Sequence, residues 1–242
     1  MNKRTGFTLV ELAIVFIIIG LLIGGILVAS SMVDTAKAEK LVKDLQQFSI
    51  ATVNFQTAYK ATPGDAKNFS PAGNGNGIIE DSSGTGTSNT FTGEVANYWV
   101  HLSAVGFKPK GVTLSAIPTA NGITAGFNVP EVSYGIRGTG AVVVNGAFVS
   151  NATGTTNDGN NYYMLLGLPS GAAAGANITG LPAFTVNQAT AIDLKIDDGK
   201  PGTGSVKADA GNGGCLNGSS YNSSYSPTTP ACNLYIKNTF TQ

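Results

Sequence analysis

The sequence predicts an α+β protein, in which a long N-terminal α-helix packs on a C-terminal globular head with an antiparallel β-sheet. Three observations support this. Residues 7–60 carry an unbroken helical pattern, and the rest of the chain alternates short apolar runs with segments rich in Gly, Ser, Thr and Asn. Only two later segments repeat apolar residues at helical spacing. Runs of strands with segregated helices are typical of the α+β class.

The N-terminal segment predicts a membrane anchor. Residues 7–32 contain one formal charge, Glu11, and roughly 20 apolar residues suffice to cross a hydrocarbon core of about 30 Å. A secretory signal has its small-residue cleavage site after the apolar region, whereas Gly6 precedes it and follows a short basic leader. Cleavage after Gly6 would therefore remove the leader's charges and keep the anchor.

The helical pattern continues beyond the anchor as an amphipathic stripe. Apolar and small residues recur at spacings of three and four: Leu41, Leu45, Phe48, Thr52, Phe55 and Tyr59. One helix from Phe7 to about Lys60 would be about 80 Å long at about 1.5 Å per residue. We expect the membrane half, residues 7–31, to pack among copies of itself and the amphipathic half, residues 32–60, to contact the head.

Residues Gly6-Phe7-Thr-Leu-Val-Glu11 resemble the processing site of type IV pilins and type II secretion pseudopilins. The resemblance implies that residues 1–6 are a leader, that a prepilin peptidase cleaves after Gly6 and methylates Phe7, and that Glu11 governs assembly. It also implies three kinds of partner: copies of the chain, other pilin-like subunits and an inner-membrane assembly platform.

Glu11 has a physical reason to be functional. A carboxylate in a membrane costs several kcal/mol by order of magnitude and usually has a specific partner. We expect that partner to be the cationic amine of Phe7 in a neighbouring subunit, so that pairing sets the axial register of a filament. The alternative is a single-pass anchor with an incidental glutamate.

Residues 61–242 are expected to form the head, because Thr62-Pro-Gly-Asp65 is a turn signal that ends the helix. Residues 94–105 predict a short helix, and Thr185 with Gln188 fits a capping box at the start of a second helix. The strand candidates are residues 112–117, 131–136, 142–144, 147–149, 162–166 and 234–236, with Asn145-Gly146 as a hairpin turn.

The two cysteines, Cys215 and Cys232, bracket a polar loop in a segment that would face an oxidising compartment. We expect a disulfide between them. The segment between the two cysteines also resembles the C-terminal disulfide region of pilins.

A calcium site is a further candidate. Asn74, Asn76 and the glycine that follows fit the middle of a D-x-[DN]-x-[DN]-G loop, and Glu80 and Asp81 could supply carboxylates. The ends do not fit, since Ala72 and Ser83 occupy the first and twelfth ligand positions. The alternative is a plain Asn/Gly turn without metal. No other cofactor is expected.

Few features of the sequence indicate an enzyme. The single histidine, His101, rules out an H-E-x-x-H zinc site, and no nucleophile-elbow or phosphate-loop motif occurs. We expect His101 to pack beside Trp99, and Asp197 and Asp198 to project apart on a helix. Loss of Lys3 and Arg4 with the leader leaves 12 basic and 14 acidic side chains, and no basic patch indicates nucleic acid.

The sequence therefore predicts a structural filament subunit, single-pass in the inner membrane before assembly and then part of a periplasmic filament or an extracellular pilus. Two alternatives remain open. The chain is a pseudopilin of a type II secretion system, or it is a minor pilin or tip adhesin whose head binds a surface ligand.

Overall fold

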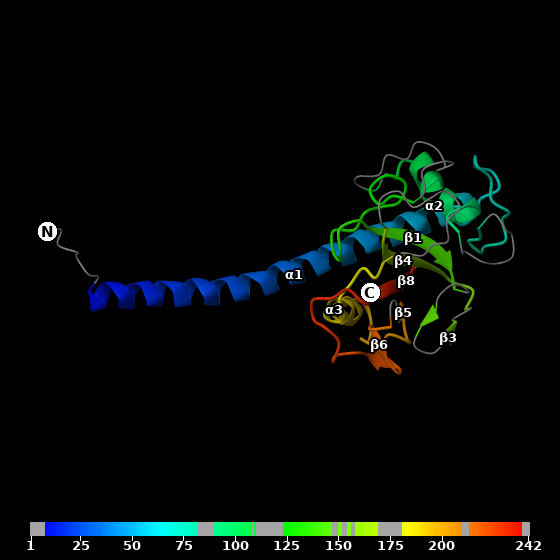
Figure 1. The fold of residues 1–242 in the computed structure, drawn as a ribbon. Coiled ribbons are helices and arrows are strands. Elements are labelled where there is room, and N and C mark those ends of the chain that lie inside the picture. The colour runs from blue at the N-terminus through cyan, green and yellow to red at the C-terminus, as the bar shows by residue number, and fades with distance from the viewer. Residues whose placement is uncertain are drawn as a thin grey trace. The chain divides into compact units, whose positions relative to one another are not determined.

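The structure is a computed structural model with two compact units, residues 1–39 and 40–242. Helix α1, Leu9–Tyr59, is continuous (Figure 1). Over the described residues this confirms the single helix expected from Phe7 to about Lys60. The structure describes residues 8–81, 90–107, 109, 123–146, 150–151, 154–155, 158–168, 181–209 and 213–238.

The second half of α1 supplies part of the core of the second unit. On its inner side, Leu41 and Leu45 are fully buried and Phe48 is 5% exposed. Thr52 Oγ1 lies 3.0 Å from the Tyr163 hydroxyl and also contacts the hydroxyl of Tyr98. The stripe expected from the sequence is therefore the packed face of the helix from Leu41 to Phe55, with one polar cluster inside it, whereas Tyr59 at its end is 48% exposed.

Four antiparallel strands form the central sheet, in the order β1-β4-β8-β5 (Figure 1). They are β1 (Thr139–Asn145), β4 (Asn161–Gly167), β8 (Asn233–Lys237) and β5 (Val206–Asp209). Two small hairpins lie outside this sheet: β2 (Ser150–Asn151) pairs with β3 (Gly154–Thr155), and β6 (Leu216–Asn217) pairs with β7 (Ser220–Tyr221). The α+β class is confirmed.

Alternate residues of β4 face opposite sides of the sheet. On one side, the ring of Tyr163 packs against Phe48 of α1 and against Trp99 of the next helix along the chain, at centroid distances of 5.9 and 6.1 Å. Helix α2, Gly93–Ala104, is further tied to β1 because Trp99 Nε1 donates to the carbonyl of Ala141 at 3.0 Å. Tyr162, the neighbouring residue, instead bonds Lys207 of β5.

Helix α3, Val186–Ile196, begins where the capping box predicted it. Thr185 Oγ1 accepts from the Gln188 amide at 3.3 Å, and Gln188 Oε1 accepts from the Thr185 amide at 3.0 Å. Ala189 and Ile192 are fully buried, and the helix lies against β5.

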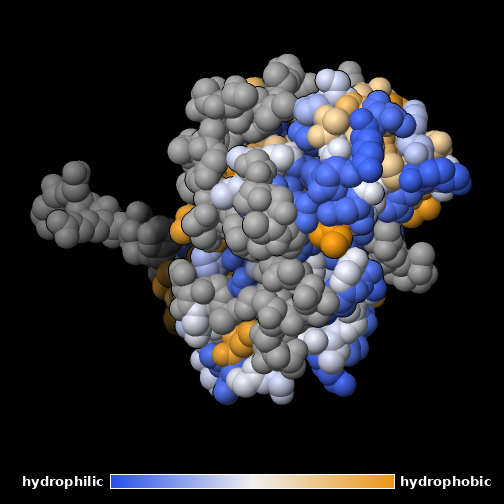
Figure 2. Space-filling view, turned by 90° about the vertical axis from the view of Figure 1, so that its right-hand side faces the viewer, coloured by the Kyte–Doolittle hydropathy of each residue, from blue (hydrophilic) through white to orange (hydrophobic). Residues whose placement is uncertain are grey.

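Figure 2 shows that the described surface of one face of the molecule is mainly hydrophilic.

The strand expected at residues 131–136 is wrong. Only an isolated bridge from Glu131 to Gly140 forms there. Gly135 has a φ of 95°, and the Ile136 amide donates to the carbonyl of Ala183 at 2.8 Å. A left-handed glycine turns the chain away from an extended path, so the apolar alternation does not become a strand. The candidates 112–117 and 147–149 lie outside the described residues.

The expected disulfide between Cys215 and Cys232 is present, and both residues are fully buried. Cys232 also forms an antiparallel bridge with Phe184, directly before α3. From the loop that the disulfide closes, the Tyr221 hydroxyl donates to Asp193 Oδ2 of α3 at 2.8 Å. The bridge to Phe184 and the hydrogen bond to Asp193 therefore both hold this loop to the head.

Candidate assembly and ligand sites

The expected assembly residue, Glu11, lies in the first turn of α1 and closes a capping box with Thr8. Glu11 Oε2 accepts from the Thr8 amide at 2.8 Å and from the Thr8 hydroxyl at 2.9 Å. Thr8 Oγ1 accepts in return from the Glu11 amide at 3.3 Å. The expected processing residues, Gly6 and Phe7, lie outside the described residues.

The capping role of Thr8 was missed at the sequence level, although the T-x-x-E spacing is a known start signal for a helix. The box satisfies amides that a helix start would otherwise leave unpaired in an apolar medium. Within the described part of the chain, both hydrogen bonds that Glu11 accepts end on Oε2. Oε1 can therefore accept a bond from another donor while the box stays closed.

Residues Leu9–Ile26 form a helix long and apolar enough to cross a membrane, and none of this segment is buried. At about 1.5 Å per residue its 18 residues span about 27 Å. Large apolar side chains such as Leu9, Phe16 and Leu21 are 87, 70 and 73% exposed. An apolar surface of this extent requires lipid or protein around it.

The candidate calcium residues lie in a loop built from Asx turns. Asn74 Oδ1 accepts from the Asn76 amide at 2.9 Å, and Asn76 Oδ1 accepts from the Ile78 amide at 2.8 Å. Asn74 Nδ2 donates to Glu80 Oε2 at 2.7 Å. Asp81 binds elsewhere, since its Oδ2 accepts from the Thr90 amide at 3.1 Å.

The same loop is held to α2 by a carboxylate that the sequence did not single out. Glu94 Oε1 accepts from the Asn74 amide at 2.7 Å, and Oε2 accepts from the Glu80 amide at 3.1 Å. Burial is the main cause that raises the pKa of Glu94 to about 7, and the nearby charge of Asp65 adds to it. Asp65 in turn accepts from the amides of Asn76 and Gly77. Backbone amides thus donate to both carboxyl groups, and a side-chain hydrogen bond also links Glu94 with Asp65.

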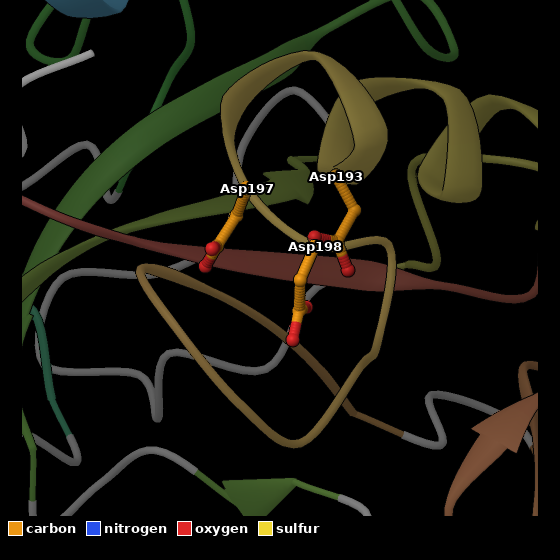
Figure 3. Close-up of side chains that lie close together, drawn as sticks. All are labelled: Asp193, Asp197 and Asp198. Atoms are coloured by element: carbon orange, nitrogen blue, oxygen red, sulfur yellow. The ribbon is translucent and has the colours of Figure 1, made fainter.

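A second acidic cluster gathers at the end of α3, where Figure 3 shows the three carboxylates of Asp193, Asp197 and Asp198 on one side of the ribbon. One oxygen of each lies within 4.8 Å of the others. The expectation that Asp197 and Asp198 project apart on a helix is wrong, because α3 ends at Ile196 and both lie in the following turn.

Each carboxylate of this cluster already accepts hydrogen bonds. Asp193 accepts from the Gly199 amide at 3.1 Å as well as from Tyr221, and Asp198 accepts from the Thr203 hydroxyl at 2.6 Å. Burial is the main cause that raises the pKa of Asp193 to about 6. Carboxylate oxygens suit a hard cation such as Ca²⁺, so this cluster could hold a metal ion.

Comparison with known proteins identifies the N-terminal segment. Residues 1–27 match the family model described as the prokaryotic N-terminal methylation motif. This motif marks the prepilin-type segment of type IV pilins and pseudopilins, which are structural proteins rather than an enzyme family. Together with the apolar helix, it fits a membrane-anchored precursor. No curated protein and no solved structure matches the chain.

Proposed function

We propose that this chain, which begins with a prepilin-type methylation segment, is a structural subunit of a type IV filament. In this proposal a prepilin peptidase removes residues 1–6 and methylates Phe7, and residues 7–31 hold the subunit in the inner membrane. An assembly platform then adds it to a filament outside that membrane. Residues 32–60 join this segment to the head, residues 61–242.

The observation that carries the proposal is the exposed apolar helix Leu9–Ile26, which starts within the methylation motif. Lipid covers such a helix before assembly, and the same segment of other subunits can cover it afterwards. Transfer between two apolar surroundings costs little, because neither exposes apolar surface to water.

In this proposal, Glu11 sets the axial register of each subunit as it moves from the membrane into the filament. Cleavage after Gly6 creates a cationic amine on Phe7, and an amine of one subunit can pair with the carboxylate of the next. Glu11 Oε1 is the oxygen available for this bond while Oε2 caps the helix. An ion pair in an apolar medium is strong because water does not screen it.

A type II secretion pseudopilin is the second candidate, since the methylation motif occurs in both classes. The two differ in where the filament ends. A pilus subunit is abundant in filaments that extend from the cell surface, whereas a pseudopilin stays in the periplasm. A tip adhesin would be a minor component whose head binds a surface ligand.

Peptide mass spectrometry of filaments sheared from the cell surface tests the proposal. The expected result is an abundant peptide that begins with N-methylated Phe7. Processed chain found only in cell envelopes would favour the pseudopilin, and trace amounts in filaments would favour a minor pilin. An intact Met1 leader on the assembled chain would contradict the proposal.

Variants at the capping box separate assembly from helix stability in the same assay. We expect Glu11→Gln to lower filament yield at least roughly tenfold. A neutral amide cannot form the ion pair with the Phe7 amine, and a charge left unpaired in the membrane costs several kcal/mol by order of magnitude. Thr8→Val is the matched control, since it removes the cap, worth about 1 kcal/mol, and leaves the carboxylate. Wild-type yield in Glu11→Gln would contradict the assigned role.

Calcium binding at the loop that contains Asn74, Asn76, Glu80 and Asp81 also remains a proposal. The hydrogen bond from Asn74 Nδ2 to Glu80 Oε2 brings these two side chains together, and both carry oxygen atoms of the kind that Ca²⁺ binds. Calorimetric titration of the purified chain with Ca²⁺, with Glu80→Gln as control, is the direct test.

A further inference from the structure

The single histidine of the chain, His101, is fully buried on α2. Its Nδ1 lies 2.9 Å from the amide nitrogen of Gly64, which donates to it. An acceptor nitrogen carries no proton, so the proton of the neutral ring is on Nε2. Nε2 lies 2.6 Å from the carbonyl oxygen of Pro71 and donates to it. One imidazole therefore binds both ends of the segment from Gly64 to Pro71.

The ring also packs against two aromatic side chains, which contact each other at a centroid distance of 4.9 Å. It stacks on Phe55 of α1 at a centroid distance of 6.3 Å and an interplanar angle of 17°. Phe69, from the segment that the imidazole binds, lies on it at 5.0 Å. His101 thus joins the end of α1, helix α2 and residues 62–71, the loop that leads from α1 into the head.

This loop lies directly on the backbone of α2. A Cβ at Gly64 would stand 2.5 Å from the carbonyl oxygen of Glu94, and Gly64 has a φ of +88°. Only glycine fits this position without strain.

We propose that His101 is an acid-sensitive latch: the neutral imidazole holds residues 62–71 on α2, and its protonation releases them. The protonated ring has donors at both nitrogens. Nδ1–H would then face the N–H of Gly64, and two donors cannot bond. The added charge would also lie in a buried site beside the rings of Phe55 and Phe69, where taking it out of water is costly.

The groups around the ring give the direction of its titration. Burial is the main cause that lowers the pKa of His101, while the hydrogen bond to Pro71 and the charge of Asp65 act in the opposite sense. From α1 the ring meets the uncharged Phe55. On α2 itself, Tyr98 and Glu94 lie one and two turns before it.

The sign of the pH dependence follows. In the open loop His101 has its ordinary pKa of about 6.5, and in the latched state its pKa is lower. The latch is therefore complete above about pH 6.5 and weakens as the pH falls toward the latched pKa. Each unit between the two pKa values increases loop opening tenfold.

Global unfolding cannot isolate this effect. The pKa of Glu94 is raised to about 7 and that of Asp193 to about 6. Both carboxyl groups bind protons more tightly in the folded chain, so they stabilise the head as the pH falls through the range where the latch weakens. The test must read the ring and the loop directly.

The chain offers such a test, because it has one histidine. In the full chain labelled with ¹⁵N-histidine and held in detergent micelles, we expect the Nε2–H tautomer at pH 7.5 and a titration midpoint below 6.5. Amide exchange in residues 62–71, corrected for its intrinsic pH dependence, should rise with the same midpoint. Exchange in β4 should not change at that midpoint.

A variant removes the titration while keeping an aromatic ring. In His101→Phe, the amides of residues 62–71 should exchange rapidly at pH 7.5, and their exchange rate should show no step with pH. The histidine titration and loop exchange of the wild-type chain test the latch even if this variant does not fold. An Nδ1–H tautomer, or a protonated ring without a matching rise in loop exchange, would overturn the latch. The proposal does not depend on filament assembly.

Discussion

At the scale of single residues, Lys207 of β5 shows how a buried charge is kept in the head. Its side chain is 7% exposed, and Nζ lies 3.6 Å from Asp158 Oδ2. Nζ donates to the Tyr162 hydroxyl at 2.9 Å, and that hydroxyl donates to Asp158 Oδ2 at 2.6 Å. Burial lowers the pKa of Lys207, and the charge of Asp158 acts against this. The carboxylate thus keeps the ammonium charged.

We expect Asp158→Asn to lower the free energy of unfolding by about 1–3 kcal/mol, because it leaves the Lys207 charge buried without an anion. The figure is smaller than for a fully buried pair, since Asp158 is 31% exposed. Denaturant titration of the oxidised chain at pH 7 measures it. As the matched control, adding Lys207→Met should recover part of the loss. No recovery would mean that the charge pair is not the cause.

The same pair predicts acid sensitivity. Burial acts to raise the pKa of Asp158, but hydrogen bonds from Tyr162 and Asn160 and the charge of Lys207 together lower it to about 2. A lowered carboxyl pKa stabilises the fold above its ordinary value of about 3.9 and loses this effect as the pH falls toward 2. Asp158→Asn should therefore show a smaller loss of stability over that range than the wild-type chain.

At the scale of elements, the outer side of α1 is unusual for a solvated helix. Residues 45–59 contain no Asp, Glu, Lys or Arg, although Ile50 is 60% exposed and Val53 is 44% exposed. The outer face of a solvated helix normally carries charged residues. In the proposed filament, neighbouring subunits would cover this face, so charges there would be buried on assembly.

We therefore expect Ile50→Glu to reduce filament yield strongly while the free energy of unfolding of the purified subunit changes by less than about 0.5 kcal/mol. Lys43→Glu is the control, because Lys43 is exposed on the same helix beside other charged residues. Yield of sheared filaments and denaturant titration of the subunit give the two readouts. Equal yields from both variants would show that this face stays solvated.

Elements with their own local signal were predictable. The spacing of Leu41, Leu45 and Phe48 predicted the packed face of α1, and Thr185 with Gln188 predicted the start of α3. Strand β5 was not predictable, because its four residues include Lys207. That lysine is buried only because Tyr162 and Asp158, remote in sequence, lie beside it.

The candidate sites divide in the same way. Glu11 could be singled out because a lone carboxylate in an apolar segment needs no tertiary information to be noticed. The cluster of Asp193, Asp197 and Asp198 depends on where α3 ends, and element boundaries are the part of a sequence prediction least fixed by local pattern. Glu94 was missed because its partners, Asn74 and Glu80, come from a loop that folds back onto α2.

At the scale of the whole molecule, the compact unit begins at Lys40, twenty-one residues before the head expected from the turn at Thr62-Pro63. The reason is that α1 is part of the core. Leu41, Leu45 and Phe55 are at most 2% exposed, and the loop that His101 binds stacks against the end of this helix through Phe69 and Phe55.

We therefore expect a chain of residues 40–242 to fold in water without detergent and a chain of residues 61–242 to fail. The shorter chain loses four large buried side chains: Leu41, Leu45, Phe48 and Phe55. Each contributes about 2–5 kcal/mol, and their sum is comparable with the total stability of a domain, about 5–15 kcal/mol. Near-ultraviolet circular dichroism and urea titration of both chains, each with the Cys215–Cys232 disulfide formed, measure the outcome. Cooperative unfolding of residues 61–242 would show that the head is an independent domain and that α1 only docks on it.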